Sequence, residues 1–167
     1  QRLMSEWKTR GEEQSYDTLI PQAAEATIAS ITPVDDALFM NPVNMENALI
    51  HYCRHHALQV PKNKAEIVRC VLQSLAFKYR QAVEQLNRCL PSPIRQLNII
   101  GGGPQNQLLN QLTADELGIP VYAGPVEATA MGNILTQAMA KGEIADLREL
   151  REIVTRSVTP QVYYPKK

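Results

Sequence analysis

Three consecutive glycines, Gly101, Gly102 and Gly103, form the segment whose residue types most favour ligand chemistry. A short apolar stretch at residues 96–100 predicts a strand before them, and a helix is expected from about Gln105. Glycines let the backbone turn sharply and expose main-chain N–H groups to a ligand. The N-terminus of the next helix adds unpaired amides and the positive end of its dipole. The order strand, glycine turn and helix therefore predicts a nucleotide-binding corner.

The spacing of these glycines excludes two common phosphate-binding motifs. The dinucleotide fingerprint Gly-x-Gly-x-x-Gly lacks its third glycine, because Asn106 stands near that position. The P-loop needs a lysine after its last glycine, and none follows here. A tight turn between a strand and a helix that binds no ligand stays open as the alternative.

A second informative segment, Gly-Pro-Val-Glu-Ala-Thr-Ala-Met-Gly-Asn, covers residues 124–133 and follows a second expected strand at 119–123. Small residues on the helix that begins there would let its backbone approach a neighbour closely; they are Ala128, Ala130 and Gly132. For them, close packing of the helix on a sheet is favoured over ligand binding. Glu127 is interpreted as a first-turn acid that stabilises the helix dipole, rather than as a catalytic base.

The first half of the chain is predicted to be helical with proline-rich connections. Apolar residues keep helical spacing from the first residue, so the chain is expected to begin inside an element of a longer protein. The predicted order is a helix at 1–8, a short turn capped by Ser15, a helix opened by Pro21, extended segments at 31–33 and 39–42, a helix after Pro42, and a long helix at 64–88. The expected apolar stripe of the long helix comprises Ile67, Val71, Leu75, Tyr79, Ala82 and Leu86.

After Pro91 and Pro93 the pattern alternates between strands and helices. Strands are predicted at 96–100 and 119–123, and helices at about 105–117, 127–140 and 146–158, with an extended tail at 160–164. Gly118 is expected to close the first of these helices, and Asp146 with Glu149 forms a capping box for the last. This order predicts an α/β fold with a parallel or mixed sheet flanked by helices.

The composition of the chain limits which partners and which cellular location are expected. Seventeen basic and seventeen acidic residues cancel, so no net field is expected to attract nucleic acid or an anionic membrane. No apolar run reaches the length of a membrane span and no signal peptide is recognisable. The chain is therefore predicted to be soluble and cytoplasmic.

The cysteines and histidines do not predict a disulfide framework or a metal site. Cys53 and Cys70 fall on consecutive predicted helices and could meet if those helices pack antiparallel, but free thiols are expected in a reducing cytosol. His51 and His55 lie one helical turn apart, and no third ligand is evident, so they are interpreted as surface histidines.

Three segments together resemble the C-terminal lobe of the FGGY carbohydrate kinases. They are the glycine turn at 101–106, the helix and turn at 108–118, and the segment Val-Tyr-Ala-Gly-Pro-Val-Glu-Ala-Thr-Ala-Met-Gly-Asn at 121–133. The stretches 39–45 and 69–76 narrow the resemblance to the members that act on L-rhamnulose, and kinases of L-fuculose or L-xylulose are the alternatives.

The resemblance implies a fold, a reaction and a set of site residues. Residues 1–167 are expected to be a truncated C-terminal lobe of an actin-like ATPase (RNase H-like) fold, with ATP and a ketose bound between it and the protein's own N-terminal lobe. The implied reaction moves the γ-phosphoryl group of ATP, with Mg²⁺, to the 1-hydroxyl of L-rhamnulose. The implied nucleotide-binding residues are Gly102 above all, then Gly101, Gly103 and Gln1, together with Gln105 and Asn106, which either bond the nucleotide or cap the helix. At Gly102 any side chain should clash with the nucleotide.

The family's other catalytic parts have no match in these residues. An aspartate general base and Gly-Thr phosphate loops are implied, yet no Asp-x-Gly-Thr or Gly-Thr-Ser/Trp segment occurs. No catalytic residue and no metal ligand is therefore expected within the 167 residues, and the fragment alone is predicted to be inactive. A non-kinase ATPase sensor of the same fold and a non-catalytic interaction domain remain as alternatives.

Overall fold

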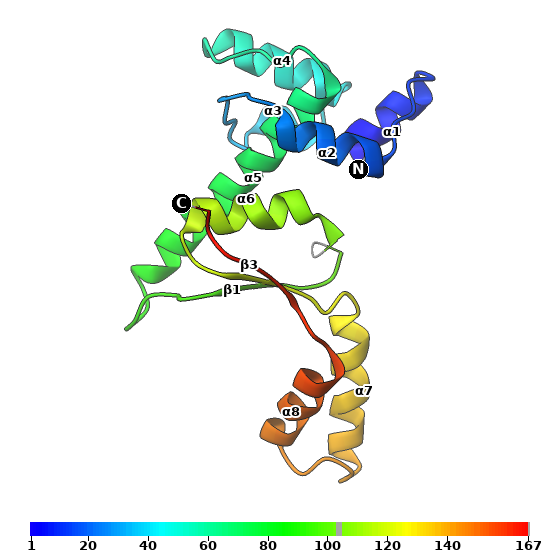
Figure 1. Cartoon of the computed structure of the whole chain (residues 1–167), viewed down its shortest axis with the longest axis vertical. Helices are drawn as coiled ribbons and strands as arrows, with labels where there is room; N and C mark the ends of the chain where they lie inside the picture. Colours follow the sequence, from blue (N-terminus) through cyan, green and yellow to red (C-terminus); the bar gives the residue numbers. More distant parts are fainter. Residues whose placement is uncertain (103–104, 167) are drawn as a thin grey trace. The chain divides into compact units, whose positions relative to one another are not determined.

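The computed structural model describes residues 1–102 and 105–166. By their internal contacts these residues form two compact units, Gln1–Leu86 and Asn87–Lys167, and each is described by itself (Figure 1). The first unit is helical, whereas the second contains a small sheet with helices, so the predicted α/β character resides in the second unit.

Five helices make up the regular structure of the first unit. They are α1 (Arg2–Thr9), α2 (Tyr16–Glu25), α3 (Ala37–Met40), α4 (Met45–His55) and α5 (Lys64–Asn87), the last of which ends at the boundary between the units. Their shared core consists of Trp7, Leu19, Ile28, Leu49, Ile67 and Cys70. Burial of these apolar side chains, which are far apart in sequence, is the main force that holds the short helices together.

Two side chains accept hydrogen bonds from the free N–H groups at the N-terminus of α4. Asn44 caps it locally, because its side-chain oxygen accepts the N–H of Asn47 at 2.7 Å. The carboxylate of Glu6, on α1, accepts the N–H of Met45 at 3.0 and 3.1 Å. A carboxylate at this end of a helix also interacts favourably with the helix dipole. α1 is thus joined to α4 by polar contacts as well as by the core.

Helix α2 differs from its prediction. Ser15 is its N-cap, as expected, and its hydroxyl accepts the N–H of Thr18 at 3.2 Å. Pro21 opens no new helix, since it lies inside α2, which ends at Glu25. Proline removes one main-chain hydrogen bond, but Leu19 and Ala23 are buried on either side of it, and their packing supports the helix through this position.

The segment before α4 is also more regular than predicted. Phe39 and Met40 are not extended but belong to the single turn of α3, which Asp36 caps by accepting the N–H of Leu38 at 2.8 Å. Prolines at 33 and 42 suggested extended chain throughout, because the residue before a proline avoids the helical region. That restriction reaches only one residue back, to residues 32 and 41, so the four residues of α3 between them were free to form a turn.

The length of α5 was predicted within one residue, but its buried face was not. Of the expected apolar stripe only Ile67 is buried, while Ala82 and Leu86 are exposed. The buried positions of α5 are Ile67, Cys70, Leu72, Ser74, Ala76 and Val83. The helix has apolar residues around most of its circumference, and the position of the neighbouring segments decides which of them is covered.

Polar side chains of α5 hold the irregular segment after α2. Arg69 donates to the carbonyl of Ala24 at 3.0 Å, near the C-terminus of α2. Gln73 donates to the carbonyls of Ile28 and Ser30 at 3.0 and 2.6 Å. Arg69 thereby satisfies a carbonyl that the helix end leaves without an internal partner.

The second unit contains a three-stranded sheet. Its strands are β1 (Leu97–Ile99), β2 (Val121–Ala123) and β3 (Gln161–Tyr163), in the order β1-β2-β3. β1 pairs parallel with β2, Ile99 opposite Ala123, and β2 pairs antiparallel with β3. The sheet is therefore mixed, as predicted, and the expected extended tail is its third strand.

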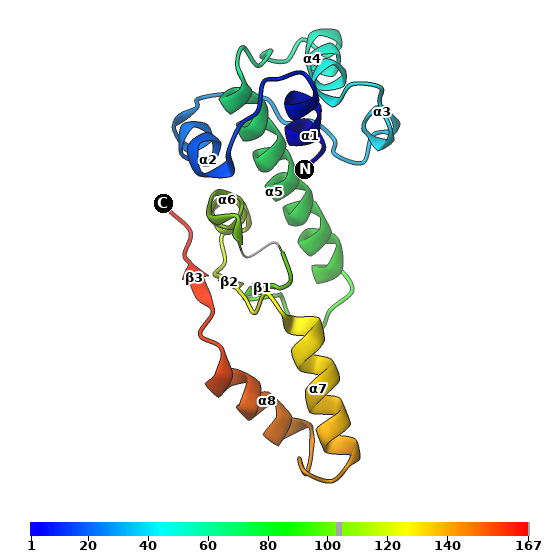
Figure 2. The ribbon, with the colours of Figure 1, turned by 90° about the vertical axis from the view of Figure 1, so that its right-hand side faces the viewer.

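Helices α6 (Gln107–Leu117), α7 (Ala128–Ala140) and α8 (Leu147–Ser157) complete this unit. α6 covers the sheet, and α7 and α8 lie side by side (Figures 1 and 2). The core between α6 and the sheet consists of Ala114, which belongs to α6, and of Val121, Ala123 and Tyr163 from the strands.

The predicted ends of these helices are confirmed. Gly118 closes α6 in the left-handed conformation with φ +66°, which glycine adopts without a steric penalty. Asp146 accepts the N–H of Glu149 at 2.9 Å, and the Glu149 carboxylate accepts the N–H of Ala145 at 2.7 Å. These contacts depend only on near neighbours, which explains why the sequence predicted them.

Candidate nucleotide-binding site

The two glycine-containing segments that the sequence singled out meet at one edge of the sheet. β1 and β2 are parallel, so their carboxyl ends lie together, and a turn follows each strand. The N–H of Gly124 donates to the carbonyl of Ile99 at 2.8 Å, and the N–H of Gly101 donates to the carbonyl of Pro125 at 3.2 Å. Ligands of open α/β sheets bind beyond the carboxyl ends of the strands. This edge is therefore the candidate site.

Gly101 and Gly102 leave the backbone of the first turn accessible in different ways. Gly101 has φ +78°, a conformation that side chains strongly disfavour. Gly102 has no such constraint, and a Cβ atom placed on it would meet no atom of the described residues within 4 Å, its chain neighbours apart. The clash expected at Gly102 is therefore not with the described part of this chain, and it stays a prediction. Gly103, the third predicted glycine, lies outside the described residues.

Asn106 and Gln105 occupy the start of α6. The side-chain oxygen of Asn106 accepts the N–H of Leu109 at 3.0 Å, so Asn106 is the N-cap of the helix. Its amide nitrogen takes no part in this hydrogen bond. The N–H of Gln105 approaches the carbonyl of Gly102 at 3.4 Å, and its side chain is exposed. The sequence left open whether these residues bond a nucleotide or cap the helix, and the structure gives the capping role to Asn106.

Gln1, the remaining predicted site residue, belongs to the first unit. It precedes α1, where its carbonyl accepts the N–H of Ser5 at 3.0 Å, and its side chain is exposed. Its contact with a nucleotide stays a prediction.

Two apolar residues beside the glycines are exposed, which the sequence did not predict. Ile100 is 58% exposed and Val126 is 41% exposed. Each lies next to a residue of the Gly101–Pro125 hydrogen bond, one on each turn. In the sequence they look like ordinary members of an apolar strand and of a turn. Their exposure at the same edge follows only from the pairing of β1 with β2.

Glu127 occupies the N-cap position of α7, one residue before the helix begins. Its side chain makes no capping hydrogen bond and is exposed. A carboxylate at this position interacts favourably with the positive end of the helix dipole, consistent with the structural role expected for it.

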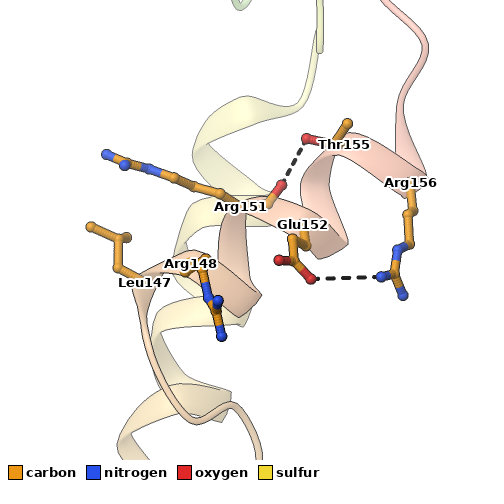
Figure 3. A pocket seen from close by; sticks show the side chains of 6 residues that line it. All are labelled: Leu147, Arg148, Arg151, Glu152, Thr155 and Arg156. Atoms are coloured by element: carbon orange, nitrogen blue, oxygen red, sulfur yellow. Dashed lines mark hydrogen bonds and ion pairs between the residues drawn. The ribbon is translucent and has the colours of Figure 1, made fainter.

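A separate hollow of about 380 Å³ lies on α8. It is lined by Leu147, Arg148, Arg151, Glu152, Thr155 and Arg156, all from this one helix. Figure 3 shows the guanidinium groups of the three arginines apart from one another, and Arg156 forms an ion pair with Glu152 at 3.6 Å. Guanidinium groups held apart in this way do not enclose a common anion, so the glycine turns remain the better candidate.

All three cysteines are free, as expected, and Cys53 and Cys70 are buried. Burial, and then the neighbouring Cys53 thiol, raises the pKa of Cys70 to about 12. The imidazole rings of His51 and His55 stack with centroids 6.1 Å apart. Within residues 1–102 and 105–166, no three His, Cys, Asp or Glu side chains are grouped so that they could hold a metal ion. Over the same residues, no helix has both the length and the apolar character needed to span a membrane.

Comparison with known proteins identifies the family. Residues 1–141 match the C-terminal domain of the FGGY family of carbohydrate kinases. The match covers most of the chain, and the chain belongs to this family. The resemblance predicted from the glycine turn and the segment at 121–133 is thereby confirmed.

Curated relatives narrow the similarity within the family. The chain is 46% identical to a rhamnulokinase of Bacteroides thetaiotaomicron over 153 residues. This matched region covers 91% of this chain and 32% of that protein. It is 44% identical over 133 residues to a rhamnulokinase of Bacillus subtilis, covering 80% of this chain and 27% of that protein. The chain thus spans about a third of the length of the curated relatives it matches.

Solved structures support the fold. A xylulose kinase from Rhodospirillum rubrum superposes with a TM-score of 0.63 at 18% identity, over 98% of this chain and 32% of that one. A ligand-bound xylulose kinase from Lactobacillus acidophilus gives the same score and identity over 33% of its chain. The predicted fold class, part of the C-terminal lobe of an actin-like sugar kinase, is confirmed.

Proposed function

We propose that this chain is the nucleotide-binding part of a sugar kinase that transfers the γ-phosphoryl group of ATP to the 1-hydroxyl of L-rhamnulose. The observation that carries the proposal is the place of the bare backbone at Gly102, which lies beyond the carboxyl ends of two parallel strands and before the N-terminus of α6. A turn that supports a nucleoside needs that backbone free of side chains.

The residues of this chain would bind and orient the nucleotide. The backbone at Gly101 and Gly102 forms the surface on which the nucleoside rests, and the dipole of α6, whose N-terminus follows the turn, favours the negative phosphates. Asn106 keeps that helix end in place through its cap. In this proposal the bound nucleotide supplies the phosphoryl group, and the phosphates of the nucleotide bind the Mg²⁺ ion.

Other residues of the longer kinase would bind and activate the sugar. Phosphoryl transfer depends on positioning and charge stabilisation, and the sequence of this chain holds neither an aspartate base nor a Gly-Thr phosphate loop of the expected pattern. We therefore assign residues 1–167 to the C-terminal lobe and expect the isolated chain not to phosphorylate sugar. The N-terminal lobe of the same protein is the expected partner, and the cytoplasm the expected location.

L-rhamnulose is favoured over L-fuculose and L-xylulose by the relatives. Proteins named rhamnulokinase are 44–47% identical to most of this chain. The xylulose kinase structures, at 18% identity, bear on the fold and not on the sugar. An ATPase sensor of the same fold is the second candidate, and sugar-dependent ADP formation by the full-length protein separates it from a kinase.

Nuclear magnetic resonance of the ¹⁵N-labelled chain with ADP tests the nucleotide site directly, because it detects millimolar affinities. We expect the amide signals of Gly101 and Gly102 to shift on addition of ADP. Gly102→Val should weaken binding at least tenfold without unfolding the chain, whereas Ala140→Val, at an exposed position at the end of α7, should leave it unchanged. Unshifted glycine signals, or an unaltered affinity of Gly102→Val, would contradict the proposal.

A further inference from the structure

Three histidines lie together at the C-terminal end of α4, on the side of the helix that faces solvent. His51 and His55 are one helical turn apart and exposed, and His56 follows as the C-cap. The rings of His51 and His55 are nearly parallel, with an interplanar angle of 13° and centroids 6.1 Å apart. Apart from ring contacts, these three side chains form no hydrogen bond or ion pair with any described residue. Their ring nitrogens are therefore available to an ion from solution.

The first two imidazoles are placed to share one ion, and the third is not. Side chains four residues apart are neighbours on one face of a helix, whereas adjacent residues do not face each other. His56 instead stacks on Tyr52, with ring centroids 4.1 Å apart, and meets the ring of His55 edge-on. His51 and His55 are thus the pair that matters, and His56 is an equally exposed histidine outside it.

Two imidazoles at this spacing chelate a divalent transition-metal ion. Neutral imidazole is a ligand that Cu²⁺, Ni²⁺ and Zn²⁺ accept, whereas Mg²⁺ and Ca²⁺ prefer oxygen. An ion bound at about 2.1 Å to one nitrogen of each ring holds the two ring centroids about 5 Å apart. Exposed side chains rotate on a nanosecond timescale, so His51 and His55 close the small difference from 6.1 Å without a change in the helix.

The surroundings of the pair fit an exchangeable ion rather than a permanently bound one. The C-terminal end of α4 carries the negative end of the helix dipole, which favours a cation, while Arg54, exposed in the same turn, opposes it. No third His, Cys, Asp or Glu completes a metal-binding group among the described residues. A structural zinc site needs four protein ligands. Water would therefore fill the remaining positions, and the ion would exchange with solution.

We propose that His51 and His55 form a two-histidine site for a divalent transition-metal ion on the surface of the first unit. The unfolded chain does not hold the two rings one helical turn apart, so an ion that bridges them binds the folded helix more tightly and stabilises it. The glycine turns belong to the second unit. The inference therefore goes beyond the proposed function and does not depend on it.

Isothermal titration calorimetry of the untagged 167-residue chain with NiCl₂ tests the site. Every protein in the series carries Cys89→Ser, because an exposed thiol is itself a metal ligand. His51→Ala and His55→Ala should each weaken Ni²⁺ binding at least about tenfold, since only one imidazole of the chelate remains. His56→Ala is the matched control and should stay within about twofold. Alanine favours the helix more than histidine does, so these variants keep α4 folded.

Urea denaturation followed by the fluorescence of Trp7 gives a second readout. An excess of NiCl₂ should raise the unfolding midpoint of the Cys89→Ser chain and leave that of its His51→Ala variant unchanged. Equal weakening by all three alanine substitutions would overturn the proposal, because the ion would then be attracted by the surface in general. Unchanged Ni²⁺ affinity in both His51→Ala and His55→Ala would also overturn it and show an adventitious ion only.

Discussion

The indole N–H of Trp7, on α1, donates to Oε2 of Glu46 on α4 at 2.9 Å. Trp7 is completely buried, so this carboxylate is the acceptor for a hydrogen-bond donor that water does not reach. Arg10 donates to the same oxygen, and Lys64 lies over the indole ring, 5.3 Å from its centroid. The contact joins the first helix of the unit to the helix that follows the Pro42 turn.

Glu46→Ala is expected to destabilise the first unit by about 1–3 kcal/mol, because it leaves the buried indole N–H without an acceptor. Glu84→Ala, which removes an exposed partner of Arg80 on α5, is the control and should cost about 0.5 kcal/mol or less. Urea denaturation followed by the fluorescence of Trp7, the single tryptophan, measures both. Equal losses in the two variants would show that the Trp7–Glu46 contact contributes nothing of its own.

The same carboxylate predicts a pH dependence. Partial burial pushes the pKa of Glu46 up, but hydrogen bonds from Arg10 and Trp7 and the charges of Arg10 and Lys64 outweigh it, so the pKa lies below 4.5. Between the folded and unfolded pKa values the unfolded chain binds more protons, and stability therefore rises with pH. The contribution of Glu46 is present above pH 4.5 and is lost as the pH falls through the folded value.

The unfolding free energy of the wild type measured from pH 7 to pH 3 should accordingly converge on that of Glu46→Gln at the acidic end. Glutamine keeps an oxygen acceptor for Trp7 but carries no charge, so the difference between the two proteins isolates the ionisation. A difference that stays constant from pH 7 to pH 3 would exclude this origin.

Gly101 and Gly102 should respond differently to alanine. Gly101→Ala forces a side chain into a backbone with φ +78° and is expected to cost about 1–2 kcal/mol. Gly102→Ala meets neither strain nor a neighbouring atom and should stay within about 0.5 kcal/mol of the wild type. Hydrogen exchange of the Gly124 amide, which is bonded to the carbonyl of Ile99, reports the local loss. Faster exchange in Gly102→Ala than in Gly101→Ala would contradict the assigned conformations.

Iodoacetamide should distinguish the cysteines. Cys89 is exposed, whereas burial raises the pKa of Cys53 and, together with the neighbouring Cys53 thiol, raises that of Cys70 to about 12. Because the thiolate is the reactive form, the folded chain at pH 8 should gain one adduct and the urea-unfolded chain three. Intact mass spectrometry counts them. Three adducts on the folded chain would place both buried thiols within reach of solvent.

The sequence by itself determined the parts of this protein that depend on near neighbours. Ser15, Gly118 and Asp146 were assigned to helix ends because caps and left-handed turns involve residues within about four positions. The glycine turn was recognised for the same reason, since bare backbone between a strand and a helix is a local property. These features also carried the resemblance to the family.

The tertiary structure decided what depends on residues distant in the chain. Parallel pairing of β1 with β2 brings the glycine turn and the turn after β2 to one edge and leaves Ile100 and Val126 exposed there. The buried face of α5 was likewise set by the segments packed against it, because that helix has apolar residues on several sides. Burial is a property of pairs of elements, and periodicity within one element cannot specify its partner.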